Sequence, residues 1–129
     1  MATLFTKIIN GEIPCYKVAE NEEFLAFLDI MPVKRGHVLV IPKIEVDYIF
    51  KIEDELLGRM MIFAKAVSKK IENAFPCNRI GVTVIGLEVP HAHIHLIPID
   101  KLDDMNFAKP KLKLDQQELA QIASSITQG

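Results

Sequence analysis

The chain has few cysteines, and they are not arranged in a metal-binding or redox motif. Cys15 and Cys77 are the two cysteines among 129 residues, and neither belongs to a Cys-x-x-Cys pair. Such pairs are typical of zinc fingers and thiol-redox sites, so the sequence offers neither of these motifs. We expect two buried, reduced thiols.

An excess of charge of one sign and a long hydrophobic run are also missing. The chain has 15 Lys and Arg against 17 Asp and Glu, a net charge of -2 and a pI of about 6.1. A basic field of the kind that binds nucleic acid or anionic membranes is therefore absent. No stretch approaches the ~18 apolar residues of a membrane span, and residues 1–7 lack the pattern of a secretion signal. We expect a cytoplasmic protein without a nucleic-acid or membrane partner.

What is present indicates one globular domain over residues 1–129, because 50% of the residues are hydrophobic and 25% are charged. The helices and strands that we expect in it make its fold class α+β. Hydrophobic periodicity predicts helices at residues 4–9 and 54–74, a helical turn at 45–50, and a last helix capped by Asp115 with Glu118 three residues on. Alternation and turn residues predict strands at 15–19, 23–28, 37–41, 79–85 and 91–98.

Three of the four histidines stand at alternate positions in the last of these strands. On a pleated strand His91, His93 and His95 would share one face, with Ala92, Ile94 and Leu96 on the other. We therefore expect the apolar residues to point inward and the imidazoles to line a surface. A lone histidine is usually a packed or solvated residue, but three in register favour a functional site.

A metal site is the main alternative chemistry. Histidines two apart on a strand are about 6.6 Å apart and the outer pair about 13 Å, whereas zinc needs ring nitrogens within about 2.1 Å. Two neighbouring histidines could share an ion, but three on a flat strand could not easily do so. A phosphate ester or anhydride fits better, because its charge is spread over several oxygens and neutral imidazole is a competent nucleophile at phosphorus. We expect no metal and no cofactor.

These features resemble the histidine triad (HIT) superfamily, and within it the small histidine triad nucleotide-binding proteins. The most specific part is His-φ-His-φ-His-φ-φ, where φ is apolar, matched by residues 91–97. Supporting matches lie within residues 4–9, 11–14, 26–32 and 37–43. The resemblance covers most of residues 4–98, which leaves residues 101–129 as a C-terminal extension.

The resemblance implies an antiparallel sheet of about five strands with one long helix, in a homodimer. It implies hydrolysis or nucleotidyl transfer at the α-phosphate of an AMP- or GMP-containing conjugate. His93 would form a covalent nucleotidyl intermediate, His91 and His95 would contact phosphate or handle protons, and His37 would support the site. Asp29 would accept the ribose hydroxyls, and the walls of the base pocket would be Leu4, Phe5, Ile8, Phe27 and Ile30.

The loop before the triad departs from the family pattern. Family members commonly carry Asn-x-Gly and then Gly-Gln-Ser/Thr, whereas this chain has Val84-Ile85-Gly86 and then Glu88. A carboxylate repels a bound phosphate, so we expect slow turnover or an unusual substrate. Two other functions remain open: a nucleotide-binding or sensing module with little turnover, and a metal-binding protein that uses two triad histidines.

Overall fold

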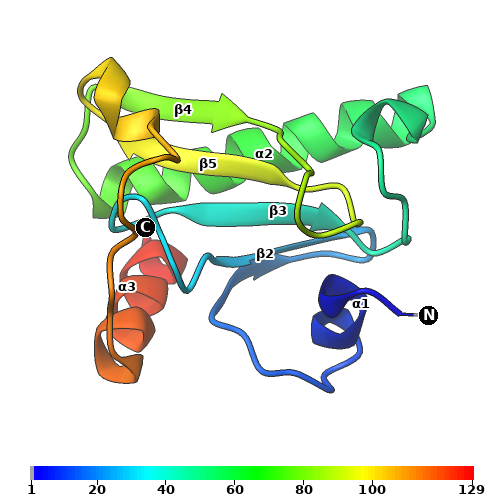
Figure 1. Cartoon of the computed structure of the whole chain (residues 1–129), viewed down its shortest axis with the longest axis horizontal. Helices are drawn as coiled ribbons and strands as arrows, with labels where there is room; N and C mark the ends of the chain where they lie inside the picture. The colour runs from blue at the N-terminus through cyan, green and yellow to red at the C-terminus, as the bar shows by residue number, and fades with distance from the viewer. Residues whose placement is uncertain (1) are drawn as a thin grey trace.

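The computed structural model describes residues 2–129, which form a five-stranded antiparallel sheet with three α-helices (Figure 1). The strands are β1 (Lys17–Glu20), β2 (Phe24–Leu28), β3 (Val38–Pro42), β4 (Arg79–Thr83) and β5 (Ile94–Ile99). The helices are α1 (Leu4–Ile9), α2 (Asp54–Ala74) and α3 (Gln116–Gln128), with 3-10 turns η1 (Ile49–Lys51) and η2 (Leu102–Met105). The predicted α+β class is confirmed.

The strand order is β1-β2-β3-β5-β4, and every neighbouring pair is antiparallel. β1 and β2 form the predicted hairpin, whose turn is stabilised by Asn21 Oδ1 accepting backbone N–H groups. In the central strand, Leu39 lies opposite Phe27 on one side and His95 on the other. Because residues directly opposite each other share a face, these three side chains mark the face that carries the histidines.

The other face of the sheet is covered by α2, which lies behind the strands in Figure 1. This helix begins and ends at the predicted residues, and its buried positions follow helical spacing: Met60, Ala64, Val67 and Ile71. Ala92, Ile94 and Leu96 belong to the same core, so the inward-facing half of the predicted alternation is confirmed.

α3 completes this core. Asp115 Oδ1 accepts the N–H of Glu118 at 2.8 Å, and Glu118 Oε1 accepts the N–H of Asp115 at 3.3 Å, which is the predicted capping box. Leu119, Ile122, Ala123 and Ile126 are buried with residues of α2 and the sheet. The last helix therefore shares one hydrophobic core with the rest of the described chain.

α1 packs on the histidine-bearing face. Thr3 caps the helix by accepting the N–H of Thr6 at 3.0 Å, and the helix ends before Gly11, whose φ of +79° favours glycine. Phe5 is buried against Phe27, with ring centroids 5.6 Å apart. α1 thus forms one wall above the sheet.

β5 begins at Ile94, three residues later than predicted, so His91 and His93 precede the strand. Between them, the backbone of Ala92 is bound by the loop after β3 rather than by a strand, because its N–H donates to the carbonyl of Val46 at 2.7 Å. The prediction that all three triad histidines lie on one strand is therefore wrong. Two smaller differences are that β4 ends at Thr83 and that only residues 49–51 form the predicted helical turn.

The two thiols are free, as predicted, but they are half-buried rather than buried. Partial burial raises the pKa of both Cys15 and Cys77, which keeps them protonated at neutral pH. Across residues 2–129, the helices lack the combination of length and apolarity that crossing a membrane requires.

Candidate active site

All four histidines are gathered on the sheet face opposite α2. The ring centroids of His93 and His95 are 4.9 Å apart, and those of His37 and His95 are 5.2 Å apart. Their side chains are nearly inaccessible, with exposed fractions of 0–7%. The imidazoles were expected to line a surface, but that surface is not exposed, because Phe5 and Phe107 pack edge-on against the histidine rings.

Both ring nitrogens of His91 are bound by the protein itself. Nε2 donates to the carbonyl of Pro42 at 2.8 Å, so Nδ1 of the neutral ring accepts from the hydroxyl of Thr3 at 2.9 Å. Glu45 holds this corner together by accepting from the Thr6 hydroxyl at 2.6 Å and the Thr3 N–H at 2.9 Å. His91 anchors the start of the triad to the N-cap of α1 and to the end of β3.

The backbone binds one ring nitrogen of His93, and the other has no hydrogen-bond partner within residues 2–129. Its Nδ1 donates to the carbonyl of His91 at 2.8 Å. A neutral imidazole carries a single N–H, so Nε2 of His93 keeps its lone pair. The backbone therefore selects the tautomer in which Nε2 can act as a nucleophile or a base.

A hydrogen bond between His37 and His95 selects their tautomers too. The N–H of Val33 donates to His37 Nδ1 at 3.2 Å, which leaves the His37 proton on Nε2. That Nε2–H donates to His95 Nδ1 at 2.9 Å. His95 then carries its own proton on Nε2, and offers an N–H donor beside the free nitrogen of His93.

Burial keeps this pair neutral. Desolvation, with a smaller contribution from neighbouring positive charge, lowers the pKa of His37 to about 3 and that of His95 to about 4. Desolvation also lowers the pKa of His91. At neutral pH these three rings are uncharged, as their hydrogen bonds require.

A cavity of about 440 Å³ lies in front of His93 and His95, a volume typical of small-molecule sites. Asp29 lines it and has two roles available. Its Oδ1 accepts the N–H of Met31 at 2.9 Å and so caps a turn, whereas its Oδ2 lies 3.7 Å from His37 Nε2. Burial raises the pKa of Asp29. One carboxylate oxygen therefore remains available for a ligand.

The five apolar residues expected to surround a base lie in different environments. Phe5 and Phe27 are buried beneath α1, and Ile8 packs against their cluster. Leu4 and Ile30 are exposed, at 48% and 58%. None of the five lines the histidine cavity, and Phe5 meets the site only through the edges of the histidine rings.

Several residues that line this cavity were not among the site residues expected from the sequence. Among them, Phe107 and Lys111 come from the segment after η2, for which no helix or strand was predicted. The N–H of Leu112 donates to the carbonyl of Pro32 at 2.8 Å and ties this segment to the rest of the molecule. Neither residue belongs to the triad motif or to a predicted element, so the sequence did not indicate them as site residues.

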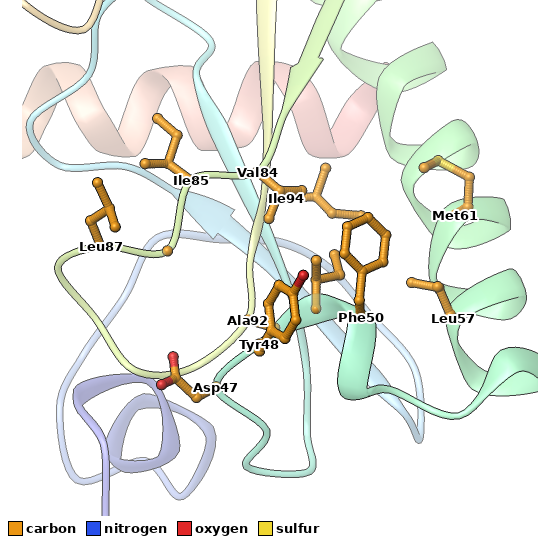
Figure 2. A pocket seen from close by; sticks show the side chains of 12 residues that line it. Asp47, Tyr48, Phe50, Leu57, Met61, Val84, Ile85, Leu87, Ala92 and Ile94 are labelled. Carbon is orange, nitrogen blue, oxygen red and sulfur yellow. The ribbon is translucent and has the colours of Figure 1, made fainter.

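A larger cavity of about 610 Å³ lies next to the first and has no histidine in its lining. Figure 2 shows its aromatic and aliphatic walls, which include Tyr48, Phe50, Leu57 and Met61. The two cavities share the loop of residues 85–87. We assign the candidate active site to the smaller cavity, because its lining carries the nucleophilic and hydrogen-bonding groups.

Comparison with known proteins gives the family of the chain. The model of the HIT domain matches residues 10–102, more than half of the sequence. The chain belongs to the HIT family. The resemblance found in the sequence is confirmed.

Relatives of this HIT protein cover most of its length. It is 36% identical over 133 residues to the protein hit of Bacillus subtilis, covering 95% of this chain and 90% of that one. It is 40% identical over 100 residues to an adenosine 5′-monophosphoramidase of Schizosaccharomyces pombe, covering 76% and 74%. The crystal structure of a HIT-like protein from Bartonella henselae superposes with a TM-score of 0.85 at 28% identity, covering 98% and 94%.

One group of side chains in this HIT protein could hold a metal ion. Asp29, His37 and His95 each offer a ligand atom, and these atoms lie within 4.8 Å of one another. A carboxylate with two imidazoles is a donor set that suits zinc. An ion there would replace the hydrogen bond between His37 and His95, and it would use one triad histidine rather than the two that the sequence analysis considered.

Proposed function

We propose that this HIT protein is a nucleotide hydrolase or nucleotidyl transferase acting at the α-phosphate of a purine nucleoside phosphoramidate or a related conjugate. The observation that carries the proposal is the free Nε2 of His93, held beside the N–H of His95 on the wall of a 440 Å³ cavity. The phosphoramidase activity named for the relative from Schizosaccharomyces pombe supports the same reaction class.

In the first step, His93 Nε2 attacks the α-phosphorus and the bond from phosphorus to the leaving nitrogen breaks. His95 is neutral, so it acts as a hydrogen-bond donor to a phosphate oxygen rather than as the acid. The leaving amine therefore takes its proton from water. Attack makes the His93 ring positive. The carbonyl of His91, which accepts its Nδ1–H at 2.8 Å, stabilises that charge.

In the second step, water attacks the same phosphorus, the bond to Nε2 breaks and the nucleotide leaves while a proton passes to solvent. His93 returns to its neutral tautomer. His91 and His37 act as positioning residues in this scheme. Asp29 accepts the ribose hydroxyls, and Leu4, Phe5, Ile8, Phe27 and Ile30 remain the proposed surroundings of the base.

The test is a panel of adenosine and guanosine phosphoramidates and dinucleoside polyphosphates. We expect AMP or GMP to be released from at least one phosphoramidate, measured by chromatography of both products. Saturable AMP binding without turnover would instead support the sensing module. A protein that neither binds nor turns over any of these nucleotides would overturn the proposal.

The metal-binding alternative rests on the group formed by Asp29, His37 and His95. Metal analysis of protein purified without a histidine tag decides it. A stoichiometric ion that is lost in His37→Gln would favour this function, because the remaining two ligands bind much more weakly. Protein that contains no bound metal would exclude the metal-binding function.

We propose that the protein is a homodimer. β4 is an edge strand, so its outer backbone groups have no partner strand within the described chain. Large apolar side chains gather next to this edge: Val82 is 51% exposed, and Met61 and Ile62 on α2 are 51% and 69% exposed. A second copy supplies both a matching strand edge and a matching apolar surface, as two-fold symmetry requires.

Sedimentation tests the dimer. We expect a species of twice the 14.5 kDa chain mass at micromolar concentration. Val82→Glu should shift it towards monomer, because it places a charge in the apolar contact. Lys7→Glu on α1 is the matched control and should leave the dimer intact. A monomeric wild-type protein would contradict the proposal.

A further inference from the structure

We propose that Lys111 binds the phosphate of the nucleotide, an inference that rests on the proposed function. Within residues 2–129, Lys111 is the one lysine or arginine whose side chain lines the histidine cavity. It comes from the C-terminal segment of residues 106–112, which we call the strap. The strap thus supplies a part of the active site that the triad and the sheet do not.

The strap is fixed at several points, so Lys111 is held at the cavity. Leu112 is bonded to Pro32, and Lys109 pairs with Asp103 at 2.6 Å. Phe107 packs its edge against His95, with centroids 5.0 Å apart. These contacts join the strap to both neighbouring segments and to the triad.

The ammonium group of Lys111 is oriented by contacts with the protein and keeps hydrogen-bond donors for a ligand. Its Nζ lies 5.4 Å from the centroid of the Phe107 ring and donates to the Phe107 carbonyl. An ammonium carries three N–H donors, so two remain for a ligand. The side chain is half-buried, which limits the screening of its charge by solvent.

The charges around the cavity explain why a cation is needed. Asp29 and Glu88 both line it and bring negative charge, and each would repel a phosphate when ionised. His95 cannot compensate, because it is buried and neutral at physiological pH. Lys111 is therefore the group that can offset the phosphate charge in this lining.

A purely structural role for Lys111 predicts a different result. If Lys111 only balances Asp29 and holds the strap, its loss would disturb the cavity for any ligand. If it binds phosphate, its loss would weaken the binding of AMP but not that of adenosine. The pair of ligands separates the two roles.

The experiment measures AMP and adenosine affinities by calorimetry for the wild type and for Lys111→Met. We expect the affinity for AMP to fall about tenfold or more, as for loss of a charge-assisted hydrogen bond, with adenosine binding unchanged within about twofold. Lys111→Arg should retain most of the preference for AMP. Lys113→Met, an exposed neighbour that does not line the cavity, is the matched control and should behave as wild type.

Two results would overturn the inference while leaving the proposed function standing: an unchanged affinity for AMP in Lys111→Met, or an equal loss for AMP and adenosine. A wild-type protein that binds AMP no better than adenosine would also overturn it. A wild-type protein that neither binds nor hydrolyses any nucleotide would overturn the proposed function, and this inference with it.

Discussion

Substitution of His93 by alanine is expected to reduce turnover of a nucleoside phosphoramidate by about 10⁴-fold or more, because it removes the proposed nucleophile. His93 is the central triad residue, and its Nδ1–H is bound to the carbonyl of His91, so its Nε2 is free to attack. Nucleotide affinity should change by less than about tenfold, because binding would depend on other groups. The effect should therefore appear in kcat rather than in KM.

Mass spectrometry of a quenched wild-type reaction should locate a nucleotidyl group on His93. His95→Ala is the informative comparison: it should slow the reaction less, because it removes a hydrogen-bond donor, and its adduct should still map to His93. An adduct on His91 or His95 would refute the assignment. So would a His93→Ala protein that turns over at the wild-type rate.

Acidification from about pH 7 to about pH 5 is expected to lower the free energy of unfolding by on the order of 4 kcal/mol through His37 and His95 alone. In the unfolded chain both titrate near 6.5, whereas in the folded protein their pKa values are about 3 and about 4. Over this interval the unfolded chain takes up protons that the folded protein does not. Stability is therefore greatest above pH 6.5 and falls as the pH drops towards the folded pKa values.

Urea unfolding at the two pH values, followed by circular dichroism, measures this difference. His37→Gln and His95→Gln should each reduce the pH-dependent loss by about 2 kcal/mol, whatever their effect on absolute stability. Asp103→Asn is the matched control, because its ion pair with Lys109 lowers the pKa of Asp103, so that group titrates below the interval. An equal loss in the wild type and both histidine variants would contradict the prediction.

Local features of the sequence were sufficient for most of the secondary structure. α2 shows the spacing of buried residues that an amphipathic helix requires, and α3 begins at a capping box whose two residues are three apart. The family could also be predicted, because the triad motif is one short, unbroken stretch of the chain. In each case the signal and the structure that it predicts lie within a few residues of each other.

Tertiary contacts decided how the histidines are used. His91 and His93 lie outside the expected strand, where the loop after β3 binds the backbone of Ala92 between them. The His93 tautomer depends on the carbonyl of a residue two positions away. The neutral state of His37 depends on burial, which lowers its pKa, and its tautomer is fixed with a hydrogen bond to His95, which lies 58 positions away. Alternation along a strand contains no information about such partners.

The composition of the cavity was likewise decided by the tertiary structure. The histidines could be identified from the sequence, but Lys111 lines the cavity because the strap is hydrogen-bonded to Pro32 through Leu112 and packs Phe107 against His95. The sequence by itself determined the family, the helices and the identity of the candidate nucleophile, since these depend on short-range spacing. Only the folded chain determined which nitrogen is free, which ring is neutral and which cation lines the site, because those properties depend on burial and on contacts between distant segments.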